Sequence, residues 1–140
     1  MSEFISNNLN ETYQIATDLA KSLKPNDIIA YSGTMGMGKT AFTRGLVEAL
    51  GGGDIVSSPT FAIINQYDTP KFIVYHFDMY RVESWDDLYS TGFFDYLDTG
   101  AIIIIEWSEN ITGALPKGVI FVDISMGDDD NSRIIKIDRS

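Results

Sequence analysis

The segment Gly33-Thr34-Met35-Gly36-Met37-Gly38-Lys39-Thr40 decides the fold of this 140-residue chain. It matches the pattern G-x-x-x-x-G-K-T, in which glycines allow backbone N–H groups to curve around phosphate oxygens. In this pattern the lysine reaches the β- and γ-phosphates, and the threonine hydroxyl ligates Mg²⁺. The segment therefore predicts a phosphate-binding loop for a nucleoside triphosphate, and the bland alternative is an ordinary glycine turn.

The sequence on either side of this segment supports a binding loop. Residues 27–31 are a short β-branched run that is typical of a buried strand. Residues 39–50 carry apolar side chains at helical spacing until three glycines follow at 51–53. The order strand, glycine loop, helix places a helix N-terminus at the anion.

The rest of the chain predicts further helices and strands. Residues 10–23 have the apolar spacing of a helix, with Asn10 as its N-cap and Pro25 as its end. Ser84 resembles the cap of a short helix. The remaining apolar runs predict one central strand at 101–105 and two hairpins of antiparallel strands, at 61–67 with 72–77 and at 119–125 with 134–138.

A second carboxylate is expected where the central strand ends. Glu106 directly follows the isoleucines of that strand, and a site for Mg²⁺ and phosphate needs an acid there to hold the metal directly or through water. The alternative is a surface acid at a strand end. Trp107 is either a core residue or an aromatic side chain that docks against adenine or a protein partner.

The run His76-Phe77-Asp78-Met79-Tyr80-Arg81 gathers four polar functions at the end of a predicted strand. Alternation places His76, Asp78 and Tyr80 on one side if the strand continues. Asp78 could hold Mg²⁺ through water or orient the attacking water, and Arg81 could meet γ-phosphate charge. The alternative is a structural ion pair between Asp78 and Arg81, with His76 packed in the interior.

Two loops carry weaker indications. The segment Ser57-Ser58-Pro59-Thr60 lies between the predicted glycine-loop helix and the first hairpin. In nucleotide-dependent switch proteins, a loop in this position senses the γ-phosphate through a Ser or Thr hydroxyl group. A turn into the next strand is the alternative. The three acids at 128–130 are interpreted as a solvated turn.

Length and composition favour a single domain, 1–140, that is cytoplasmic and has no membrane segment. The chain has no cysteine, which excludes disulfides and thiolate metal sites. Its formal net charge of −10 would repel a phosphate backbone, so strong independent binding of RNA or DNA is not expected.

Taken in order, the glycine segment, Ser58-Pro59-Thr60-Phe61, the run 76–81 and Ile105-Glu106-Trp107 closely resemble the TsaE family. This family comprises bacterial ATPases of tRNA threonylcarbamoyladenosine biosynthesis. The resemblance covers about residues 10–125. It implies an α/β fold, a P-loop NTPase-like mixed β-sheet flanked by helices, with antiparallel hairpins.

The resemblance also implies a function and a set of site residues. It implies a weak, Mg²⁺-dependent ATPase that assists the partner proteins TsaB and TsaD. These partners modify the adenosine next to the anticodon of tRNAs reading codons that begin with A. The chain would therefore contact tRNA only through the complex. It implies Lys39, Asp78 and Glu106 as the catalytic set, Thr40 and Glu106 as Mg²⁺ ligands, and Thr60 as a switch residue. The expected nucleotide contacts are Thr12, near adenine, and Gly33, Thr34, Met35, Gly36, Met37, Gly38, Lys39, Thr40 and Ala41.

Two other functions remain open at this stage. A small P-loop kinase would need an acceptor pocket and usually a basic lid, but the ten Lys and Arg residues are scattered. A non-catalytic protein in which ATP only orders an interface is the second alternative. A small GTPase is disfavoured because the chain has no Asn-Lys-x-Asp element.

Overall fold

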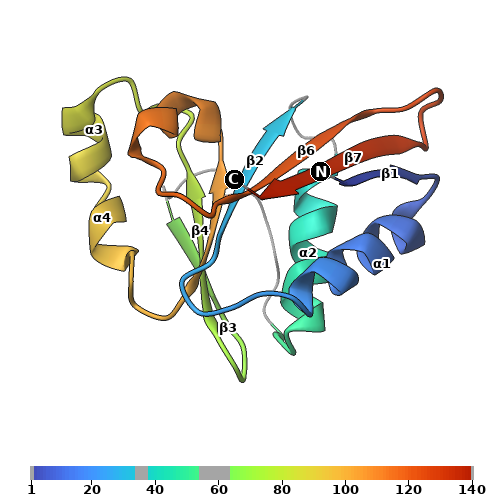
Figure 1. The fold of residues 1–140 in the computed structure, drawn as a ribbon, viewed down its shortest axis with the longest axis horizontal. Helices are drawn as coiled ribbons and strands as arrows, with labels where there is room; N and C mark the ends of the chain where they lie inside the picture. Colours follow the sequence, from blue (N-terminus) through green and yellow to red (C-terminus); the bar gives the residue numbers. More distant parts are fainter. Residues whose placement is uncertain (1, 34–37, 54–63, 140) are drawn as a thin grey trace.

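A computed structural model describes residues 2–33, 38–53 and 64–139. The described strands form a seven-stranded sheet in the order β1-β7-β6-β2-β5-β4-β3 (Figure 1). The strands are β1 Ser2–Ser6, β2 Ile28–Gly33, β3 Ile64–Asp68, β4 Ile73–Asp78, β5 Ile102–Glu106, β6 Ile120–Met126 and β7 Arg133–Arg139. The helices are α1 Leu9–Ala20, α2 Lys39–Ala49, α3 Trp85–Ser90, α4 Phe93–Tyr96 and the 3-10 helix η1 Ser108–Ala114.

The sheet is mixed, as the sequence predicts. Strand β2 pairs in parallel with β5 and β6, and β4 pairs in parallel with β5. The two predicted hairpins are confirmed as the antiparallel pairs β3–β4 and β6–β7. Because parallel neighbours end at the same edge of a sheet, the ends of β2, β4 and β5 lie together.

Helices cover both faces of the sheet. Strand β5 is buried along its whole length, and its side chains alternate between two core clusters. Ile102 and Ile104 pack with α1 and α2, whereas Ile103 and Ile105 pack with α3, α4 and η1. Figure 1 shows these two groups of helices on opposite sides of the sheet.

Helices α1 and α2 approach each other closely at Gly45. A Cβ atom at Gly45 would lie 2.9 Å from the Cβ of Ala16, so any side chain there would push the helices apart. The predicted end of α2 is confirmed, because the helix stops at Ala49 and Gly51 takes a φ of +90°.

The predicted start of α1 is wrong. Asn8, rather than Asn10, is the N-cap, since its side-chain oxygen accepts a hydrogen bond from the backbone N–H of Glu11 at 2.9 Å. The helix ends at Ala20, before Pro25. Asparagine is a favoured N-cap residue at either position, so the residue type alone does not show which of the two begins the helix.

Three short elements were not predicted: β1, α4 and η1. Strand β1 extends the sheet beside β7, and four of its five residues are exposed. It therefore lacks the alternation that identifies a half-buried strand. None of the described helices is long and apolar enough to cross a membrane.

Candidate functional site

The start of α2 has the geometry of an anion site. Gly38 precedes the helix with a φ of +80° and a ψ of −4°, a backbone conformation that strains any other residue. No side chain caps the first turn of α2, so its backbone N–H groups carry the positive end of the helix dipole. The predicted contacts Thr34, Met35, Gly36 and Met37, and the switch loop with Thr60, lie outside the described residues.

Lys39 is buried at this helix start, with 3% of its surface exposed. Its Nζ atom lies 5.7 Å from the centre of the Trp107 ring, which is within the range of a cation–π contact. Trp107 is half-buried and has a φ of +61°, and the Tyr80 ring lies 4.9 Å from it. Trp107 therefore packs at the site between Lys39 and Tyr80.

The strand ends bring Asp78 and Glu106 side by side, because these two residues are register partners of β4 and β5. Glu106 is 8% exposed, so the reading of it as a surface acid is wrong. Asp78 accepts a hydrogen bond from the backbone N–H of Tyr80 at 2.9 Å. Among the described residues no ion pair joins Asp78 to Arg81, and Arg81 is exposed.

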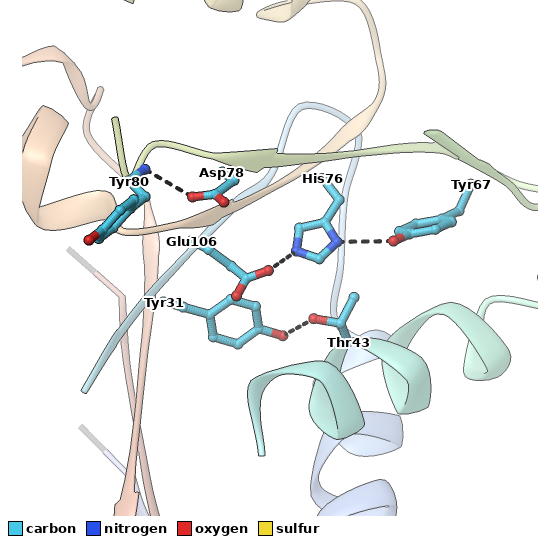
Figure 2. A network of polar contacts seen from close by, with 7 residues as sticks. All are labelled: Tyr31, Thr43, Tyr67, His76, Asp78, Tyr80 and Glu106. Atoms are coloured by element: carbon cyan, nitrogen blue, oxygen red, sulfur yellow. Dashed lines mark hydrogen bonds and ion pairs between the residues drawn. The ribbon is translucent and has the colours of Figure 1, made fainter. Parts of the chain in front are cut away.

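A buried hydrogen-bond chain holds Glu106 (Figure 2). His76 is fully buried, with Nε2 2.6 Å from Glu106 Oε2 and Nδ1 3.1 Å from the Tyr67 hydroxyl. When Glu106 is a carboxylate it can only accept, so Nε2 donates and Nδ1 can accept from Tyr67. The interior placement of His76 is confirmed. Tyr80 does not continue this face, because β4 ends at Asp78 and Tyr80 is exposed.

A second buried pair fastens α2 to the sheet and was not foreseen from the sequence. The hydroxyls of Tyr31 on β2 and Thr43 on α2 lie 2.7 Å apart. Burial raises the pKa of the Tyr31 phenol, the hydrogen bond with Thr43 partly opposes this, and the nearby charge of Glu106 adds to it. Figure 2 shows this pair beside the His76–Glu106 contact.

A cavity of about 560 Å³ lies on the α1 side of the α2 start. Its described lining includes four predicted nucleotide contacts: Thr12, Gly38, Thr40 and Ala41. Lys39, Asp78 and Glu106 are not among its lining residues. The predicted residues that the structure describes thus fall into two groups, one on the cavity and one at the strand ends, and Lys39 is linked to the second through Trp107.

The same cavity contains residues that the sequence did not single out. Arg44 and Arg133 bring positive charge to it, and Asn131 and Asp130 come from the β6–β7 turn. Asp130 lines the cavity and is exposed, as are Asp128 and Asp129, so the predicted solvated turn at 128–130 is confirmed. The described residues contain no cluster of three or more His, Asp or Glu side chains that could hold a metal ion.

Comparison with known proteins gives one consistent result. The family model described as "Threonylcarbamoyl adenosine biosynthesis protein TsaE" matches residues 6–135. The chain is 41% identical over 134 residues to a Rickettsia felis protein named as tRNA threonylcarbamoyladenosine biosynthesis protein TsaE, covering 95% of this chain and 77% of that protein. It is 37% identical to the Bacillus subtilis protein of the same name, covering 91% and 79%.

A solved structure agrees with these relatives. The crystal structure of Bacillus subtilis YdiB superposes with a TM-score of 0.76 at 29% sequence identity, covering 97% of this chain and 83% of that one. The α/β fold expected from the sequence is therefore confirmed. The chain belongs to the TsaE family, whose members are named for tRNA threonylcarbamoyladenosine biosynthesis.

Proposed function

We propose that this protein binds ATP with Mg²⁺ and hydrolyses it slowly. In this proposal it assists TsaB and TsaD in forming threonylcarbamoyladenosine next to the anticodon of tRNAs reading codons that begin with A. One observation carries the proposal: an uncapped helix start carries a buried lysine whose ammonium group faces Trp107, the residue after Glu106, and Glu106 is in register with Asp78 on the adjacent parallel strand. Family membership supplies the pathway.

The residues present suit a triphosphate. Gly38 has a left-handed backbone conformation and no side chain. The backbone N–H groups of the first turn of α2 would therefore be accessible to phosphate oxygens. Among the described contacts, Lys39 has an aromatic ring rather than a carboxylate beside its ammonium group. Its charge is therefore available to β- and γ-phosphate oxygens. The cavity beside Thr12 and Ala41 lies within the size range of sites for small ligands.

The residues present also suit Mg²⁺ held together with phosphate. Thr40, the second residue of α2, would supply a hydroxyl ligand. His76 engages Oε2 of Glu106, which leaves Oε1 to meet the metal directly or through water. When bound, the ion would neutralise charge on the β- and γ-phosphate oxygens. Asp78, in register with Glu106, would orient the attacking water or a metal-bound water.

Slow turnover follows from what surrounds these groups. An arginine finger supplies about 10³ to 10⁵ in rate in related phosphoryl transfers. Arg81 follows the end of β4 by three residues, but it is exposed and has no ion-pair contact with Asp78 among the described residues to fix it. The net charge of −10 leaves contact with tRNA to partner proteins.

The test is the variant Lys39→Ala, compared with Lys71→Ala on the β3–β4 turn as a control. Calorimetric ATP titrations and single-turnover hydrolysis are measured for each, with and without purified TsaB and TsaD. We expect Lys39→Ala to lose ATP affinity or hydrolysis and to fail in tRNA modification, while Lys71→Ala behaves as wild type. Wild-type affinity and turnover in Lys39→Ala would exclude the proposed phosphate site. ATP binding without hydrolysis in the wild-type protein with its partners would favour a non-catalytic role.

A further inference from the structure

Three aromatic side chains form a cluster on the surface at α3 and α4. The Trp85 and Phe94 rings stack at 6.5 Å with an interplanar angle of 14°, and the Tyr89 ring lies 5.1 Å from Phe94. Trp85 is 56% exposed and Tyr89 is 64% exposed. We call Trp85, Tyr89 and Phe94 the aromatic face. A contiguous exposed apolar surface of this kind commonly marks an interaction site.

A cavity of about 230 Å³ adjoins the aromatic face. It lies between α3 and η1, where Trp85, Leu88, Ile111 and Ala114 form apolar parts of its wall and Glu83, Ser84 and Asn110 form polar parts. Apolar groups together with a carboxylate suit a long side chain that has an apolar stem and a cationic end.

The segment that carries the aromatic face has only acidic charged residues. Residues 82–116 contain no Lys or Arg. They contain seven acids, and the six other than Glu106 are exposed: Glu83, Asp86, Asp87, Asp95, Asp98 and Glu109. This segment therefore accounts for a large share of the net charge of −10. A nucleic acid would be repelled here, and a second copy of the same face would meet like charges.

We propose that the aromatic face docks a protein surface that presents arginine side chains. A guanidinium group is planar, stacks on Trp and Tyr rings, and forms bidentate hydrogen bonds with carboxylates. Trp85 and Tyr89 offer the rings, and Glu83, Asp86 and Asp95 offer carboxylates on the same short segment. This inference rests on the proposed function, since it names the surface and the chemistry by which the partner complex is held.

The aromatic face is joined to the strand ends by short connections. Strand β4 ends at Asp78 and α3 begins at Trp85, while η1 begins two residues after Glu106. The Asn110 side chain of η1 donates hydrogen bonds to the carbonyl oxygens of Met79 and Tyr80, at 2.8 and 3.2 Å. A partner on this face would therefore contact elements that continue directly from the residues of the proposed ATP site.

The first test uses a probe that does not depend on the proposed function. The ¹⁵N-labelled full chain is titrated with a capped arginine–glycine peptide and, separately, with its lysine and glutamate counterparts. We expect the Trp85 indole signal and the backbone signals of α3 to shift most with the arginine peptide, less with the lysine peptide and not with the glutamate peptide. Equal shifts in β1, at the opposite end of the sheet, would show general attraction to an acidic protein and would overturn the proposal.

The second test measures docking to the purified TsaB–TsaD complex in the presence of ATP. Two variants challenge the face: Trp85→Ala with Tyr89→Ala, and Glu83→Gln with Asp86→Asn. Glu3→Gln with Ile5→Ala is the matched control, because it removes one exposed acid and one exposed apolar side chain from β1. Truncation of aromatic anchors at an interface commonly costs tenfold or more in affinity, so we expect a loss of roughly that size. The charge variant should dock more weakly, with a smaller dependence on salt.

The outcomes separate this inference from the proposed function. Wild-type docking by both face variants overturns the inference and leaves ATP binding and the partners in place. If the wild-type protein does not dock to TsaB–TsaD at all, the partner assignment fails, and the peptide titration alone decides whether the face binds arginine. If the aromatic variant converts a wild-type dimer into a monomer, the occupant is a second copy and the inference is wrong.

Discussion

Tyr31 and Tyr89 have the same side chain in opposite surroundings. The Tyr31 ring is completely buried, and its hydroxyl lies 2.7 Å from that of Thr43. The Tyr89 ring is 64% exposed and contacts only neighbouring aromatic rings among the described contacts. Tyr31 belongs to the buried polar residues behind the α2 start, and Tyr89 belongs to the aromatic face.

The two regions differ in whether their side chains find their contacts within this chain. In the described part of the chain, no buried side-chain nitrogen or oxygen lacks a hydrogen-bond partner. The buried region is therefore complete within the chain, and its energy goes into holding Glu106 and α2 in place. The aromatic face leaves apolar surface in water, which in our proposal a partner protein covers. Substitutions should thus affect stability in the first region and association in the second.

The largest effect on activity is expected from Glu106→Gln. The amide oxygen can still accept from His76 Nε2, so the fold should be retained, but the charge offered to Mg²⁺ is lost. We expect ATP hydrolysis to fall on the order of 100-fold, because metal-ion catalysis contributes several kcal/mol. Single-turnover hydrolysis across a Mg²⁺ titration measures this, with Glu109→Gln as the control. An unchanged Mg²⁺ dependence would leave Asp78 as the metal-binding acid.

Replacing His76 tests whether the buried hydrogen bonds around Glu106 contribute to the stability of the fold. His76→Leu removes the hydrogen bonds to Glu106 and Tyr67 and leaves a buried carboxylate without its partner. We expect a loss of about 3 kcal/mol in the free energy of unfolding, measured by urea denaturation. Tyr67→Phe is the matched single change, and the double variant completes a cycle. If the two losses simply add, the three residues do not act as one network.

The sequence predicted the centre of this fold better than its borders. Strand β5 and the β2–α2 unit were found, because an unbroken isoleucine run and a glycine segment between strand and helix are local signals. Strand β1 was missed, since its residues are mostly exposed and pair with β7 from the far end of the chain. The N-cap of α1 was misplaced by two residues because Asn8 and Asn10 are chemically equivalent.

The sequence predicted which residues belong to the candidate site, but it predicted only some of the contacts between them. Motif spacing indicated Lys39 and Glu106, and strand register places Asp78 beside Glu106. The contact between His76 and Glu106 joins residues thirty positions apart, and no local pattern encodes such a pair. Arg44 on α2 and Arg133 at the start of β7 likewise reach the cavity from distant parts of the chain, so no local pattern indicates them.

Tyr31→Phe should have a smaller effect that depends on pH. Loss of the hydroxyl costs about 1 kcal/mol near neutral pH, the usual contribution of one hydrogen bond. Burial raises the pKa of this phenol in the folded state, so stability from the neutral phenol is present below its ordinary value of about 10 and falls as pH rises above it. Wild-type protein should lose up to about 1.4 kcal/mol per pH unit there. Urea denaturation between pH 8 and about 11 measures both proteins. If Tyr31→Phe has the same alkaline slope, another group titrates.

The smallest effect on folding is expected from Tyr89→Ala, although it deletes a whole ring where Tyr31→Phe deletes one oxygen. Most of the Tyr89 ring already lies in water, so little apolar surface returns to water on unfolding, and exposed substitutions usually change stability by less than about 0.5 kcal/mol. Urea denaturation at neutral pH measures this change in stability. Phe93→Ala is the matched comparison, because Phe93 lies four residues further along the chain and is fully buried. Loss of the Phe93 ring should cost about 3 to 5 kcal/mol.

The same Tyr89→Ala protein should bind TsaB–TsaD more weakly while binding ATP normally. If it instead unfolds as readily as Phe93→Ala, the aromatic face is part of the core, and its exposure no longer argues for a partner.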